Sequence, residues 1–165
     1  MLPQLATILN SQDPGAALIN AIDKLLSEDR YLFTCDANER SLTHRLACYL
    51  QCEFADWHVD CEYNRDINSS DEIHFQKRLV SLALKPDSDD TEGKTVFPDI
   101  IVHKRGTASN HLVIEVKKSN SSVPRKVDLD KLQAYKTDLG YSFALFLVFN
   151  TGNAPSLEHA EWVGA

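Results

Sequence analysis

The chain reads VFPDIIV at residues 96–102 and LVIEVK at residues 112–117, two apolar, β-branched runs separated by a short segment rich in turn-forming residues. Such runs are typical of buried strands, and the segment between them predicts a hairpin-like connection. A carboxylate in such a strand needs a partner, because an unpaired charge in apolar surroundings is very costly. Asp99 and Glu115 therefore stand out as candidates for a functional site.

Side-chain alternation along the second strand places Glu115 and Lys117 on one face and Val116 on the other. If the two strands pair, Asp99 joins them, and two carboxylates and an ammonium group converge at the strand ends. Oxygen ligands of this kind suit a hard divalent cation. The alternative is a strand face in contact with solvent, with Asp99 capping a turn after Pro98. The apolar surroundings of both carboxylates favour the cation site.

The composition is that of an ordinary globular protein, since 43% of its 165 residues are hydrophobic and 25% are charged. We expect a single domain, residues 1–165, with a sizeable core. No apolar run is long enough to span a bilayer and no export signal is visible, which predicts a cytoplasmic protein without membrane contact. The four cysteines are expected to be reduced, small buried residues. A zinc site built from Cys48, Cys52, Cys61 and His58 is the weaker alternative.

The net charge of −7 argues against a protein that coats nucleic acid without specificity. The charge is uneven, however, because residues 1–72 hold five basic and 13 acidic residues, a net of −8. Residues 117–136 hold six basic and two acidic residues, a net of +4. Since this basic stretch begins at the candidate site, we interpret it as a surface that contacts phosphates. A solvated helix face is the alternative.

Hydrophobic periodicity predicts the order helix, helix, strand, strand, strand, helix, strand. We expect these elements at residues 14–28, 37–52, 57–63, 96–103, 111–118, 126–138 and 143–149. Residues 64–95 are largely polar and turn-rich, which predicts a mobile insertion. A helix before the last, fully apolar strand indicates a right-handed crossover. The pattern therefore predicts the α/β class, with a mixed sheet and helices on both of its faces.

Pro98-Asp99, then Glu115-Val116-Lys117, with Glu39 on a preceding helix, resembles the motif of the PD-(D/E)XK nuclease superfamily, the restriction-endonuclease-like fold. The resemblance covers about residues 37–149, and its specificity comes from the placement of the two halves on adjacent strands. It implies a small single-domain member with a three-layer α/β/α sandwich, a mixed central sheet and an αβββαβ core.

The resemblance also implies a metal-dependent nuclease that hydrolyses phosphodiester bonds, with DNA as the expected substrate. Its metal, Mg²⁺ or Mn²⁺, would be held by Asp99, Glu115 and the carbonyl of Val116, and by Glu39 directly or through water. Lys117 would orient the attacking water and offset charge on the scissile phosphate. The implied catalytic residues are thus Asp99, Glu115, Lys117 and Glu39. For Glu39 an alternative stands, because Asp36 three residues earlier could form a capping box with it.

Five residues are expected to contact the nucleic-acid backbone: Lys118, Arg125, Lys126, Gln133 and Lys136. Tyr135, in contrast, is expected in the core. A homodimer or a second protein is a further expected partner. Two other functions stay open. The chain could be a non-catalytic binding or regulatory module on the same fold, or a phosphohydrolase for a small nucleotide. A nuclease needs a wide basic cleft, whereas a nucleotide enzyme needs a closed pocket.

Overall fold

The computed structural model of the protein describes residues 2–63, 65–66, 75–76, 78–79, 94–95 and 97–164. Four helices come first: α1 (Pro3–Leu9), α2 (Gly15–Glu28), α3 (Arg30–Thr34) and α4 (Glu39–Glu53). The side chain of Asn38 caps α4, since its Oδ1 accepts from the Ser41 backbone N–H at 2.9 Å. The helices expected at residues 14–28 and 37–52 are therefore confirmed to within two residues, and α1 and α3 are additional.

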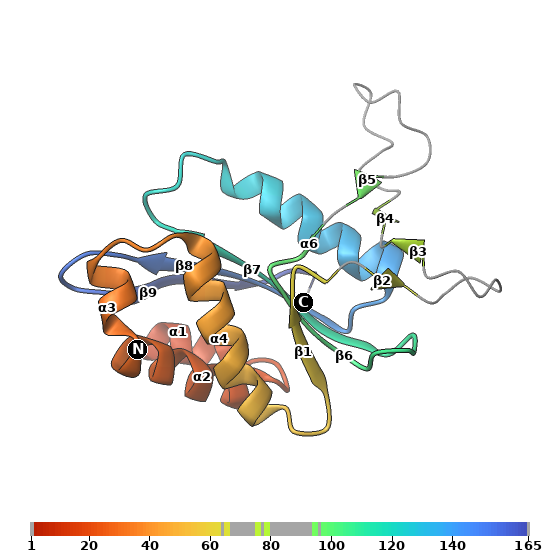
Figure 1. The fold of residues 1–165 in the computed structure, drawn as a ribbon, viewed down its shortest axis with the longest axis horizontal. Helices are drawn as coiled ribbons and strands as arrows, with labels where there is room; N and C mark the ends of the chain where they lie inside the picture. The colour runs from red at the N-terminus through yellow and green to blue at the C-terminus, as the bar shows by residue number, and fades with distance from the viewer. Residues whose placement is uncertain are drawn as a thin grey trace.

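Five strands form one mixed sheet in the order β1-β6-β7-β8-β9 (Figure 1). They are β1 (His58–Cys61), β6 (Ile100–His103), β7 (Asn110–Lys118), β8 (Phe143–Asn150) and β9 (Ser156–Trp162). Within this sheet β7 and β8 pair in parallel and the other described pairs are antiparallel, and helix α6 (Arg125–Leu139) connects β7 to β8. A parallel pair requires such a crossover. The expected mixed α/β fold is confirmed, and β9 extends the sheet beyond the predicted strands.

Apolar side chains cover both faces of the sheet, because successive residues of a strand point to opposite sides. On one face Ile114 and Val116 of β7 pack in a cluster with residues of α1 to α4. On the other face Val113 packs in a second cluster with Leu132 and Tyr135 of α6. Figure 1 shows α6 on one side of the sheet and the first four helices on the other. Glu115 and Lys117 consequently face α6.

The insertion expected at residues 64–95 lies almost wholly outside the described residues. Of that range the structure gives only the backbone of four two-residue strands. β2 (Arg65–Asp66) pairs with β3 (Phe75–Gln76), and β4 (Arg78–Leu79) pairs with β5 (Lys94–Thr95), both antiparallel. In the part of the chain that is described, no helix has the length and apolar character that a membrane crossing requires.

The cysteines differ from their expected placement. All four are free thiols, and Cys35, Cys48 and Cys52 are exposed while Cys61 is half-buried. The prediction of small buried residues is therefore wrong, because Cys48 and Cys52 lie on the solvent side of α4 rather than on its packed side.

Gly15 begins α2 directly against the end of α1. A Cβ atom at this position would lie 2.1 Å from the carbonyl oxygen of Leu9. We expect Gly15→Ala to lower the free energy of unfolding by about 2 kcal/mol or more, because backbone must move to admit the methyl group. Urea denaturation measures this loss. Gly140→Ala is the comparison, since open space surrounds Gly140 at φ +66° and only the backbone strain of about 1 kcal/mol applies. An equal loss for both variants would contradict a steric cause at Gly15.

Candidate active site

Asp99 lies directly before β6, next to β7. The antiparallel register pairs Ile100 with Ile114, which brings Asp99 to the level of Glu115 on the neighbouring strand. The Asp99 Oδ2 accepts a hydrogen bond from the Val116 backbone N–H at 2.8 Å. Burial raises the pKa of Asp99 from 3.8 to about 6, although the Val116 hydrogen bond and the charge of Lys131 act in the opposite direction.

Glu115 is more deeply buried, with 3% of its surface exposed. Its Oε2 accepts from the Nζ of Lys131 at 3.2 Å, whereas its buried Oε1 has no hydrogen-bond partner. Burial and, after it, the negative charge of Asp99 together raise the pKa of Glu115 from 4.5 to about 8. One oxygen of this carboxylate is thus an unused acceptor inside the protein, and unused buried acceptors are rare in folded proteins.

Lys117 and Lys131 supply the positive charge of the site. The Nζ of Lys117 forms a buried ion pair with the carboxylate of Asp128 on α6. Asp128 also accepts from Lys131 at 3.1 Å, so it lies between the two ammonium groups. Together Asp99, Glu115, Asp128, Lys117 and Lys131 form what we call the carboxylate–lysine cluster. Glu115 and Lys117 indeed lie on one face of β7 and Val116 on the other, as alternation predicts.

Glu39 approaches the same end of the sheet from the first turn of α4. Its Oε2 accepts from the backbone N–H of Lys118 at 2.7 Å, and its negative charge contributes to the raised pKa of Asp99. The capping-box alternative for Glu39 does not hold, because Asn38 caps α4. Asp36 instead forms an ion pair with Lys118 at 2.7 Å. Asp99, Glu115, Lys117 and Glu39 are thus gathered at one end of β7.

The residues expected to contact nucleic acid each have partners within the protein. The Nζ of Lys118 donates to the carbonyl of Ala37 at 3.0 Å in addition to its ion pair with Asp36. Arg125 pairs with Glu158 at 2.9 Å and Lys126 with Asp130 at 2.8 Å, both on the surface. Gln133 donates to Thr137 at 3.4 Å. The ion pairs of Arg125 and Lys126 are exposed and therefore weak, so these two cations can still exchange to a phosphate.

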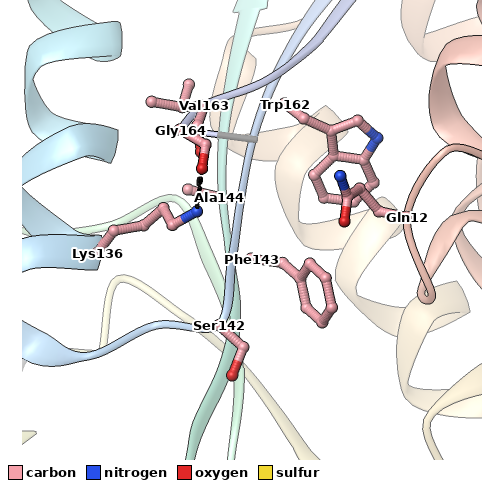
Figure 2. A pocket seen from close by; sticks show the side chains of 8 residues that line it. All are labelled: Gln12, Lys136, Ser142, Phe143, Ala144, Trp162, Val163 and Gly164. Carbon is pink, nitrogen blue, oxygen red and sulfur yellow. Dashed lines mark hydrogen bonds between the residues drawn. The ribbon is translucent and has the colours of Figure 1, made fainter.

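Lys136 lies away from the carboxylate–lysine cluster. Its Nζ donates to the carbonyls of Val163 at 3.2 Å and Gly164 at 2.9 Å. These atoms border a pocket of about 90 Å³ near the start of β8 (Figure 2). Lys117, in contrast, lies beside Val148 near the end of that strand. Figure 2 shows the Lys136 side chain reaching across to Gly164. In this arrangement Lys136 anchors the C-terminal residues to α6.

A larger pocket, of about 190 Å³, lies beside Asp99. It is lined by Arg40, Thr43 and His44 of α4, Cys61 and Glu62 at the end of β1, and Asp99. This pocket opens on the α4 side of Asp99, whereas the carboxylate–lysine cluster lies on the α6 side. The pocket was not predicted from the sequence, because its walls come from α4, the end of β1 and Asp99, which are distant in the chain.

The donor set at Asp99 and Glu115 fits a hard divalent cation. Glu115 is buried and Asp99 is half-buried, both have raised pKa values, and Glu115 keeps an oxygen without a partner. Within residues 2–63 and 97–164 no three His, Cys, Asp or Glu side chains are grouped so that they could hold a metal ion. Cys48, Cys52, Cys61 and His58, the alternative zinc ligands, therefore do not form such a group. A cation here would therefore take its other ligands from a backbone carbonyl, water or a substrate phosphate, as Mg²⁺ commonly does.

Two members of the cluster, Asp128 and Lys131, were not anticipated from the sequence. A signal exists, because Asp128 precedes Leu132 by four positions and Tyr135 by seven, which places it on the packed side of α6. Tyr135 is fully buried in the core, as expected.

Comparison of the chain with protein-family models, with curated proteins and with solved structures yields no match.

Proposed function

We propose that the protein is a metal-dependent nuclease that hydrolyses phosphodiester bonds in DNA at the carboxylate–lysine cluster. The observation that carries this proposal is the pairing of the half-buried carboxylate of Asp99 with the buried carboxylate of Glu115, together with an unused oxygen on Glu115 and a buried lysine two residues further along. The proposal includes the finer fold assignment, an α/β/α sandwich with the αβββαβ core order of the PD-(D/E)XK nucleases.

Each residue of the cluster has a chemical task in this reaction. Asp99 and Glu115 would hold Mg²⁺ or Mn²⁺ with the carbonyl of Val116, and Glu39 would act through water. The cation supplies Lewis acidity and a more acidic bound water. Lys117 offsets negative charge that develops on the phosphate. Asp128 fixes the Lys117 ammonium group by their buried ion pair.

One observation favours a second function, a non-catalytic nucleic-acid- or protein-binding module. The Nζ of Lys131 lies 3.2 Å from Glu115 and 3.1 Å from Asp128, so a side chain already neutralises part of the negative charge. A module that needs no metal could retain this arrangement unchanged. Metal binding and cleavage separate the two functions.

The first test measures metal binding by isothermal titration of Mn²⁺. We expect binding to the wild type, alone or with a phosphorothioate DNA oligonucleotide that resists hydrolysis, and no binding to the Asp99→Asn, Glu115→Gln double variant. Mg²⁺-dependent cleavage of unmodified DNA should fall about 100-fold or more in Asp99→Asn. Asp56→Asn is the control, because Asp56 is exposed in the turn between α4 and β1, and it should leave both measurements unchanged. Absence of Mn²⁺ binding with and without the oligonucleotide would overturn the nuclease proposal in favour of the binding module.

A further inference from the structure

The pocket beside Asp99 contains a buried polar atom that nothing in the protein uses. Thr43 is 4% exposed, and its Oγ1 has no hydrogen-bond partner. Threonine in a helix often bonds to the carbonyl four residues earlier, which would satisfy this hydroxyl. An unsatisfied buried hydroxyl destabilises the folded protein, because it has lost its hydrogen bonds to water without gaining others. The cost is recovered when a ligand in the pocket offers a partner, and the two rotamers that helical threonine adopts allow the hydroxyl to turn towards it.

The other walls of the pocket combine a flat ring, a soft apolar atom and an exposed cation. His44 supplies the ring, and Cys61 supplies a half-buried thiol that donates to the Thr43 carbonyl at 4.0 Å. At the rim Arg40 pairs with Glu62 at 2.8 Å, and their side chains are 83% and 47% exposed. An ion pair so exposed is weak, so the Arg40 guanidinium can exchange Glu62 for a phosphate oxygen.

We propose that this pocket takes one unstacked nucleobase of a single-stranded or locally opened DNA strand whose neighbouring phosphate reaches Asp99. Its volume of about 190 Å³ lies below the range of about 300–1,000 Å³ that suits drug-sized ligands, which fits a single base better than a larger group. His44 stacks on the base, Thr43 hydrogen-bonds to its polar edge and Arg40 contacts the backbone. Stacking on a ring together with a few polar contacts is how proteins hold unstacked bases.

The proposal names the form of the substrate and rests on the proposed nuclease function. A base inside a duplex is stacked and paired, so it cannot enter the pocket unless the strand opens or the nucleotide is extruded. The site should consequently distinguish single-stranded or opened DNA from a fully paired duplex. The readout chosen is binding without metal, because it does not depend on the chemistry at the carboxylate–lysine cluster.

The test uses fluorescence anisotropy in EDTA with labelled eight-residue oligonucleotides: dA, dC and dT homopolymers, and an abasic chain of the same length. We expect the wild type to bind at least one homopolymer about tenfold more tightly than the abasic chain. Thr43→Val should lose about five- to tenfold in affinity for that homopolymer and nothing for the abasic chain or a paired duplex. Thr43→Ser, which keeps the hydroxyl, should restore binding. Thr137→Val is the matched control, since Thr137 lies exposed on α6.

A stability measurement excludes a merely structural role for Thr43. Because Thr43→Val removes an unsatisfied buried hydroxyl, we expect it to unfold at equal or higher urea concentration than the wild type while binding DNA more weakly. Equal affinity of Thr43→Val for every homopolymer, an equal loss on the abasic chain, or no oligonucleotide binding by the wild type would each overturn the base pocket. If the wild type cleaves DNA with metal but Thr43→Val leaves oligonucleotide binding unchanged, the base pocket is overturned and the nuclease function is not. Thr43-dependent base binding without any cleavage would overturn the nuclease function alone.

Discussion

Replacing Glu115 with glutamine is expected to stabilise the metal-free protein at pH 8 by about 3–5 kcal/mol while abolishing metal binding. In the unfolded chain Glu115 loses its proton near pH 4.5, whereas in the folded protein it keeps the proton until about pH 8. Between these values the folded state binds more protons, so the stabilising contribution is present below pH 4.5 and is lost as the pH rises towards 8. Glutamine has no proton to lose and keeps the neutral form at every pH.

The measurement is the free energy of unfolding in urea at several pH values between 4.5 and 8.5, in EDTA. The wild type should lose stability across this range, and Asp99, whose pKa is raised to about 6, should add to the loss in its lower part. Glu115→Gln should remove most of the dependence on pH. Glu158→Gln is the control, because Glu158 is 43% exposed and its substitution should stay within about 0.5 kcal/mol. A pH profile that is the same for the wild type and Glu115→Gln would show that Glu115 titrates normally.

Asp128→Ala should destabilise the protein by about 3–5 kcal/mol. The substitution leaves the buried Lys117 ammonium without its carboxylate, and an uncompensated buried charge is very costly. Lys117→Ala should cost less, because Asp128 keeps Lys131 as a partner. Because Lys117→Ala still lowers stability, a loss of cleavage in this variant is informative only when its folding is measured as well. Lys117→Met fills more of the space of the lysine side chain and is the better variant for this comparison.

The double variant Lys117→Met, Asp128→Leu tests the electrostatic origin of that loss. The double variant has no buried ammonium group at position 117, and the partly exposed Lys131 keeps its contact with Glu115 at 3.2 Å, so most of the stability lost in Asp128→Ala should return. Unfolding in urea at pH 7 measures the wild type, Lys117→Met, Asp128→Leu and the double variant, with Asp128→Ala beside them. A double variant that is as unstable as Asp128→Ala would assign the effect to packing on α6 instead of charge. Cleavage should stay absent in the double variant in either case.

The strands of the sheet could be predicted from the sequence because their periodicity is local. The apolar runs at residues 100–102 and 144–149 consist mostly of branched or aromatic residues, and they are buried between helices. The helices α1 and α3 were missed because they have seven and five residues and no side-chain cap, so packing rather than local sequence stabilises them. β9 carries no clean alternation, since a register shift between Val148 and Phe149 interrupts its pairing.

Within the site, Glu115 and Lys117 could be predicted because strand alternation sets their direction, and Asp99 because the pairing of two adjacent strands brings it to the level of Glu115. Asp128 and Lys131 could not, since their role depends on how α6 lies across β7, which only tertiary packing decides. The sequence did not reveal the internal partners of Lys118 and Lys136, because these partners are distant in the chain. Lys118 donates to the carbonyl of Ala37, just before α4, and Lys136 donates to the carbonyl of Gly164 at the C-terminal end. Charge in a sequence shows which side chains are cationic, but not which anion or carbonyl each one reaches.

The connection between β1 and β6 starts and ends at one place. Cys61 lies opposite Ile100 in the antiparallel register, and the Glu62 backbone N–H donates to the Pro98 carbonyl at 3.1 Å. Because the sheet holds both ends together, the entropy of closing the connection rises by only about 0.6 kcal/mol for each doubling of its length. Evolution can therefore lengthen, shorten or replace this connection at little cost in stability, and new contacts can be gained beside Asp99 while the residues of the cluster stay in place.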